Sequence, residues 1–149
     1  MRIILITIAL MASFQSHATN FSKWTTSDFG SMGISALLGA DKTFSNIYYS
    51  VKNNNGEFII YTESSSCAFL EGYHEQTMDV NGQYVTFQKK CLSDKKTMII
   101  LPATQAGYKY ILEEFWQKPF VTFDGAQVSA KGFQVEFRKQ VAKFNNNAL

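Results

Sequence analysis

The stretch Thr77-Met78-Asp79-Val80-Asn81-Gly82-Gln83-Tyr84-Val85-Thr86-Phe87-Gln88-Lys89 indicates how the chain folds. Asn81-Gly82 lies between two extended runs, and both residues tolerate a positive φ angle, so the pair predicts a tight turn that joins antiparallel strands. In the second run Val85 and Phe87 alternate with polar neighbours, which predicts that their side chains face a core. We therefore expect an antiparallel sheet.

Further strands are predicted on both sides of this hairpin. Ile47–Val51 and Glu57–Thr62 are rich in aromatic and β-branched residues and flank the turn-forming stretch Lys52–Gly56. Cys67–Tyr73 is expected to form a third, less regular strand. The continuous apolar run Thr97–Leu101 fits a strand that is buried on both faces.

The segment before the first hairpin has little sustained periodicity. Thr19–Lys42 is rich in Ser, Thr and Gly, and we expect Phe21, Trp24 and Phe29 to anchor it onto the core. Within it, Ile34–Leu38 fits either a short strand or a single helical turn.

The C-terminal third predicts two helices around one more hairpin. A helix is expected over Thr104–Gln117, with Thr104 as its N-cap and Pro119 preventing its continuation. The second helix is expected over Ala130–Lys143, and a single apolar stripe runs along it. The hairpin strands are Phe120–Phe123 and Ala126–Ser129, and the stripe is Phe133, Phe137, Val141 and Phe144. The fold class is α+β, mainly antiparallel sheet built of hairpins, with two C-terminal amphipathic helices.

The first 18 residues have the pattern of a secretory signal. Arg2 supplies a positive charge, Ile3–Ala12 is an uncharged apolar run, and Ser16-His17-Ala18 places small residues at a cleavage site. The run is shorter than the roughly 20 apolar residues of a membrane span, which disfavours the alternative of a retained anchor. We expect cleavage after Ala18, residues 19–149 as one exported domain, and a periplasmic or secreted product without a transmembrane anchor.

The chain contains two cysteines, Cys67 and Cys91. An even number in an exported chain favours a disulfide, and one pair has one connectivity. The alternative is a nucleophilic Cys67 with His74 as its base. A free thiol does not persist in an oxidising compartment when a second cysteine is available, so we predict the disulfide.

The composition and the absence of known motifs argue against most classes of enzyme and of nucleic-acid-binding protein. The 149 residues are 46% hydrophobic, 15% aromatic and 17% charged, and the net charge of +2 provides no large basic field for nucleic acid. The sequence has no nucleophile elbow, phosphate loop, calcium loop or zinc-ligand spacing, so no catalytic residue, metal or cofactor is predicted. His74, the one histidine after cleavage, lies between Glu71 and Glu75, and it is the candidate for an alternative reading as a small hydrolase.

Two features point to a surface that contacts a partner. Lys89, Lys90, Lys95 and Lys96 bracket Cys91 and are expected to cluster at one end of the sheet, either as a solvated turn or as a docking patch for an acidic protein or anionic headgroups. Tyrosines are also more numerous than a core of this size needs, and exposed tyrosine is frequent in interfaces. The candidate contact tyrosines are Tyr48, Tyr61, Tyr73 and Tyr108.

The last third of the chain resembles the C-terminal part of invasion-associated locus B-type proteins, which are small exported bacterial proteins. The shared elements are Cys91, the apolar strand Met98–Leu101, Gly107, and Val121–Gly125 leading into Val128–Phe133. This resemblance implies a compact, β-rich exported protein without known catalysis, and it assigns no catalytic residue.

From the sequence we expect a non-enzymatic periplasmic protein that binds another extracytoplasmic protein, as an accessory factor, an inhibitor or an immunity partner of a toxin. A hydrolase that uses His74 is one alternative. A carrier that holds an apolar ligand between the sheet and the helices is the other.

Overall fold

A computed structural model describes residues 23–26, 31–38, 43–52 and 55–146 of the chain. The predicted signal, its cleavage site at Ala18, and the expected anchors Phe21 and Phe29 lie outside these residues. No helix among the described residues is long and apolar enough to cross a membrane.

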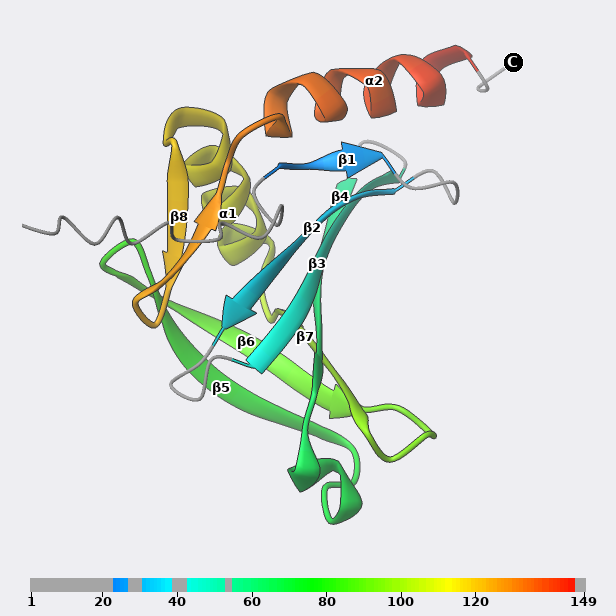
Figure 1. Cartoon of the computed structure of the whole chain (residues 1–149), viewed down its shortest axis with the longest axis vertical. Helices are drawn as coiled ribbons and strands as arrows, with labels where there is room; N and C mark the ends of the chain where they lie inside the picture. The colour runs from blue at the N-terminus through cyan, green and yellow to red at the C-terminus, as the bar shows by residue number, and fades with distance from the viewer. Residues whose placement is uncertain (1–22, 27–30, 39–42, 53–54, 147–149) are drawn as a thin grey trace, which may run out of the picture.

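The described residues form one nine-stranded antiparallel sheet and two α-helices, so the predicted fold class is confirmed (Figure 1). The strand order across the sheet is β1-β2-β3-β4-β7-β6-β5-β8-β9. The strands are β1 Thr25–Thr26, β2 Met32–Leu38, β3 Thr43–Lys52, β4 Asn55–Glu63, β5 Tyr73–Val80, β6 Gln83–Cys91, β7 Thr97–Pro102, β8 Phe120–Phe123 and β9 Ala126–Ser129. The helices are α1 Gln105–Gln117, α2 Phe133–Asn146 and the short 3-10 helix η1 Ser65–Ala68.

The sheet curls into a half-barrel, and its last strand, β9, comes into contact with β2 (Figure 1). Trp24, just before β1, joins the two edges, because its indole Nε1 donates to the Ser129 carbonyl oxygen at 2.9 Å and its backbone N–H donates to the Lys131 carbonyl oxygen at 2.9 Å. The Trp24 side chain is fully buried, so one of the three anchors expected before the first hairpin is confirmed.

The concave side of the sheet is filled largely by aromatic rings. Phe115 of α1 lies at the centre, with its ring centroid 5.1 Å from that of Trp24 and 5.2 Å from that of Phe133. Phe58 of β4 and Phe123 of β8 complete the cluster, at 6.1 Å and 6.2 Å from Phe115. All five side chains are buried, so they link the residue before β1, strands β4 and β8, and both helices in one core.

The hairpin turns form as their residues predict. Asn81 and Gly82 both have positive φ angles, as do Asp124 and Gly125, so each pair closes a two-residue turn. The first turn also bonds to the second hairpin, because the Asn81 amide oxygen accepts from the backbone N–H of Thr122 in β8 at 2.7 Å. The predicted inward orientation of Val85 and Phe87 is confirmed, since both are buried.

Two strand predictions need correction, and one open question is settled. Cys67–Tyr73 is not a strand, because the chain forms η1 and then turns at Gly72, whose φ of 75° is in the left-handed region. Thr97–Leu101 is buried on one face only, since Met98 and Ile100 point inward while their neighbours are half-buried. Ile34–Leu38 belongs to strand β2.

Helix α1 begins as predicted and takes the place of a missing strand beside β4. The Thr104 hydroxyl accepts from the Gly107 backbone N–H at 3.1 Å, which is the expected N-cap. Strand β7 pairs with β4 at Ile60–Glu63 and ends at Pro102, so the backbone of Phe58 has no strand partner on that side. The Tyr108 hydroxyl accepts from the Phe58 N–H at 2.9 Å and donates to the Phe58 carbonyl at 3.2 Å.

Helix α2 starts and ends three residues later than predicted and turns two polar residues inward. Glu136 and Gln140 are each only 6% exposed. The Glu136 carboxylate accepts from the Lys139 ammonium at 2.8 Å and from the Thr26 hydroxyl of β1, and these hydrogen bonds, the one from Lys139 foremost, hold the pKa of Glu136 below its usual value. Glu136 and Gln140 occupy the buried face of α2. Phe133 is therefore the one residue of the predicted apolar stripe that is fully buried.

Replacing Tyr108 with Phe tests the role of its hydroxyl at the gap between β4 and β7. The variant keeps the ring and leaves the Phe58 N–H and carbonyl without their partner, so we expect the free energy of unfolding to fall by about 1–3 kcal/mol. Urea unfolding measures this change. Tyr84→Phe is the matched control because Tyr84 is 74% exposed. Equal stability of the two variants would contradict this role.

Candidate functional site

Cys67 and Cys91 form the predicted disulfide. It joins the buried Cys67 in η1 to the last residue of β6, with the two Cα atoms 5.4 Å apart, as is usual for a disulfide. Neither sulfur is therefore a free thiol, and the pairing of Cys67 as a nucleophile with His74 as its base is excluded in this state.

The disulfide fixes a projecting loop at one end of the sheet. We call this region the disulfide end, and it consists of η1, the loop Phe69–Gly72 and the β6–β7 turn Leu92–Lys96. The Ser64 N–H donates to the Lys96 carbonyl at 2.9 Å, which ties the start of η1 to the turn. The Phe69 N–H donates to the Ser66 carbonyl at 3.0 Å, so the loop is held by backbone bonds as well as by the disulfide.

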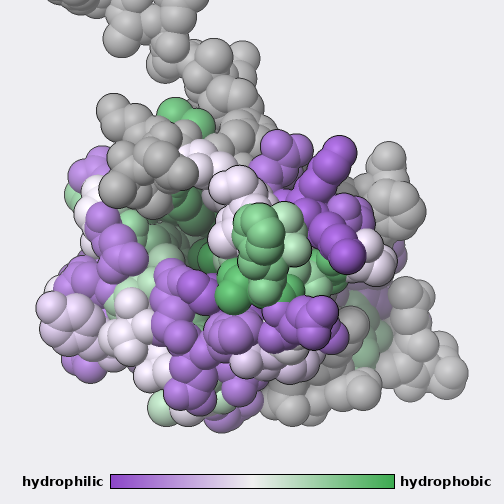
Figure 2. All heavy atoms as spheres, turned by 90° about the horizontal axis from the view of Figure 1, so that it is seen from below, coloured by the Kyte–Doolittle hydropathy of each residue, from purple (hydrophilic) through white to green (hydrophobic). Residues whose placement is uncertain are grey.

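Phe69 is the most exposed large hydrophobic side chain that the structure describes. It is 89% exposed, and Tyr73 at 59% and Leu92 at 37% belong to the same end. A hollow of about 440 Å³ lies between the loop and the β6–β7 turn, and both cysteines line it. Figure 2 views the molecule from this side and shows hydrophobic side chains gathered beside a hollow, with hydrophilic residues around them. An exposed apolar group of this kind is typical of an interaction site.

Lys95 and Lys96 belong to the disulfide end and Lys89 and Lys90 lie beside it at the end of β6, but the four predicted lysines do not form one patch. Lys90 and Lys95 line the hollow together with Glu71. Lys89 alternates with Lys90 along β6 and lies on the opposite face of the sheet, paired in register with Ile100. Lys96 is exposed in the β6–β7 turn.

An acidic residue shapes the β6–β7 turn. The Asp94 carboxylate accepts from the Thr97 hydroxyl at 2.5 Å and from the backbone N–H groups of Lys96 and Thr97. These bonds, the one from the Thr97 hydroxyl foremost, lower the pKa of Asp94. Asp94 is therefore occupied in holding the turn that carries Lys95 and Lys96.

Three of the four candidate tyrosines share the convex face of the sheet. Tyr61 lies opposite Ile99, which lies opposite Lys90, and Lys90 lies opposite Tyr73, so one row of side chains crosses four strands. The Lys90 ammonium is 4.9 Å from the centroid of the Tyr73 ring. Tyr48 packs edge-on against Tyr61, with 5.5 Å between the ring centroids. Tyr108 lies apart from this row, in α1.

His74 is placed by its backbone surroundings. Its Nε2 is 2.8 Å from the Glu71 carbonyl oxygen, a contact that helps to close the Phe69 loop. No group of three or more His, Cys, Asp or Glu residues that could hold a metal ion occurs within the described part of the chain. Asp79 and Asp124 make the backbone bonds expected at hairpin turns, since Asp124 accepts from the Asp79 N–H at 2.8 Å.

Sequence reasoning missed Phe69 and Leu92. The segment around Phe69 was expected to be a strand, and an aromatic residue in a strand is ordinarily half-buried. The available signal was the sequence Phe69-Leu70-Glu71-Gly72, in which two apolar residues, two positions after Cys67, come just before a glycine that favours a turn.

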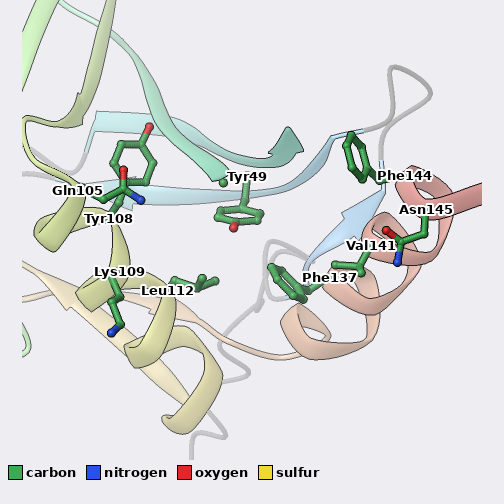
Figure 3. Close-up of a pocket in the computed structure, with 10 residues that line it drawn as sticks. Tyr49, Gln105, Tyr108, Lys109, Leu112, Phe137, Val141, Phe144 and Asn145 are labelled. Carbon is green, nitrogen blue, oxygen red and sulfur yellow. The ribbon is translucent and has the colours of Figure 1, made fainter. Parts of the chain in front are cut away.

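A second candidate site is a pocket of about 300 Å³ between the two helices and β3 (Figure 3). Helix α1 contributes Gln105, Tyr108, Lys109 and Leu112, helix α2 contributes Phe137, Val141, Phe144 and Asn145, and the sheet contributes Tyr49 and Gly56. Sequence reasoning proposed an apolar site between sheet and helices without naming its residues. The half-buried end of the α2 stripe is the part of the sequence pattern that lines the pocket.

Comparison of the chain with family models, with curated proteins and with solved structures finds no match. The resemblance to invasion-associated locus B-type proteins therefore stays a prediction, and the case for function depends on the two candidate sites.

Removing the disulfide tests how much it stabilises the fold. The two cysteines are 24 residues apart, and closing a loop of that length stabilises a protein by about 3–4 kcal/mol through the entropy of the unfolded chain. We expect the double variant Cys67→Ser, Cys91→Ser to lose this amount in urea unfolding. Reduction of the unaltered protein should give the same loss. A double variant as stable as the oxidised protein would contradict the prediction.

Proposed function

We propose that this chain is a non-enzymatic extracytoplasmic binding protein whose disulfide end docks onto a protein partner. The observation that carries the proposal is Phe69, which is 89% exposed on a loop that the Cys67–Cys91 disulfide fixes. Burying a phenylalanine side chain in a partner contributes about 1.5–3 kcal/mol. Because the loop is already ordered, binding requires little further loss of conformational entropy.

The chemistry of the partner follows from the surroundings of Phe69. The partner needs an apolar pocket for this ring, and carboxylates placed opposite Lys90 and Lys95 on the walls of the hollow. A side chain of the partner can in turn enter the hollow above the disulfide. The row of side chains on the convex face extends the contact, through Tyr61, Ile99 and Tyr73 and through Tyr48, which packs against Tyr61.

An extracytoplasmic location is part of the proposal. A disulfide that joins the only two cysteines fits an oxidising compartment, and the pattern of residues 1–18 fits export to one. The resemblance to small exported proteins without known catalysis agrees with this role. The hydrolase alternative has less support, because His74 has no thiol partner and one of its ring nitrogens contacts the Glu71 carbonyl.

Site-specific photo-crosslinking in the native cells tests the proposal. A photoreactive phenylalanine at position 69 should crosslink to one protein, and the same probe at position 84 should not. Tyr84 is the matched control because it is 74% exposed and lies at the other end of β6 from Cys91.

Once the crosslinked partner is identified and purified, its affinity for variants of this chain measures how much each contact contributes to binding. Phe69→Ser should weaken binding about 30-fold, as expected for a central aromatic contact worth about 2 kcal/mol, whereas Tyr84→Ser should leave it unchanged.

Lys95→Asn removes a charge at a residue with a φ of 53°, which asparagine tolerates, and should reduce the salt dependence of binding. Vesicles of phosphatidylglycerol that bind through Phe69, with no protein crosslinked from position 69, would overturn the proposal in favour of a membrane surface.

A further inference from the structure

The pocket between α1, α2 and β3 is independent of the disulfide end, and the hydroxyl group of Tyr49 lies at its wall. Tyr49 is 4% exposed, and its ring packs against Phe137 with 5.6 Å between centroids. Figure 3 shows this hydroxyl pointing into the space between the two helices.

The glycine at position 56 leaves room for the Tyr49 side chain. The Tyr49 ring lies over Gly56 of the neighbouring strand, and a Cβ atom at Gly56 would come 1.8 Å from the Tyr49 hydroxyl oxygen. Burial, together with the nearby Tyr108, raises the pKa of Tyr49 to about 12. The hydroxyl therefore stays protonated at physiological pH and is available as a hydrogen-bond donor.

The pocket has a polar side and an apolar side, with Tyr49 between them (Figure 3). Gln105 and Lys109 of α1 form the polar side, and Lys109 is the one charged residue in the lining. Its ammonium is 3.8 Å from Glu113, but both side chains are more than half exposed, so this weak pair leaves Lys109 free to reorient. The lining has no acidic residue, which favours an anionic ligand.

The apolar side is the part of the α2 stripe that the core does not cover. Phe137, Val141 and Phe144 are only half-buried, because α2 turns Glu136 and Gln140 inward, and Glu136 bonds to Thr26 of β1. These three side chains retain apolar surface that a ligand can remove from water.

We propose that this pocket binds a small amphipathic monocarboxylate. The apolar body lies against Phe137, Val141 and Phe144, and the carboxylate accepts a hydrogen bond from the Tyr49 hydroxyl and lies within reach of Lys109. A volume of about 300 Å³ corresponds to roughly ten water-sized groups, which is the size of an eight-carbon carboxylate. The pocket is at the small end of the range for ligand sites.

Titration of the full oxidised protein with octanoate, followed by amide NMR shifts, tests this assignment. The shifted amides should belong to α1, α2 and β3. Octanol should bind at least tenfold more weakly, because it has no charge for Lys109 and its hydroxyl is a weaker acceptor than a carboxylate. Octanol binding as tightly as octanoate, or shifts confined to the Phe69 loop, would overturn the proposal.

Two variants identify the contacts. Tyr49→Phe keeps the ring and should weaken octanoate binding about tenfold, because a hydrogen bond to a charged group is lost. Val141→Asp places a negative charge on the half-buried apolar side and should abolish binding, while Tyr84→Phe should leave it unchanged. Unaltered octanoate affinity in Tyr49→Phe and Val141→Asp would contradict the assignment.

The octanoate experiment and the crosslinking experiment test separate sites, so either proposal can fail while the other stands. Crosslinking from position 69 should be the same in Tyr49→Phe as in the unaltered protein, since the pocket and the disulfide end share no residue.

Discussion

Phe115 is the side chain around which the curled sheet closes. It projects from α1 and contacts the rings of Trp24, Phe58, Phe123 and Phe133, which belong to segments distant from one another in the sequence. The sheet alone would leave the concave faces of β4 and β8 in water. One helix that inserts an aromatic ring between them makes a single core, and the two edges can then be joined through Trp24.

The position of α1 accounts for both the gap in the sheet and the pocket. Strand β7 leaves β4 at Pro102, the chain turns into α1, and Tyr108 satisfies the exposed backbone of Phe58. Helix α2 then packs against β1 through Glu136, which turns its apolar stripe partly away from the core. The space that remains between the helices is lined by Tyr49 and by the end of that stripe.

Local patterns predicted most of the fold, because turns and caps depend on near neighbours. Asn81-Gly82, Asp124-Gly125 and Thr104 act as their residue types indicate. The errors arose where tertiary contacts decide. The disulfide constrains Cys67 within η1 where a strand was expected, and the inward-facing Glu136 leaves the α2 stripe half-buried. Of the candidate site, the lysines and Tyr73 were predicted, but the exposure of Phe69 depends on loop geometry that the sequence pattern does not encode.

Phe115 couples the two halves of the sheet, and hydrogen exchange of a Phe115→Leu variant tests this claim most directly. Loss of ring contacts in a shared core should lower amide protection in β2–β4 and in β5–β6 by the same factor, about tenfold or more. Unchanged protection in β5–β6, with loosening confined to α1, would contradict the claim.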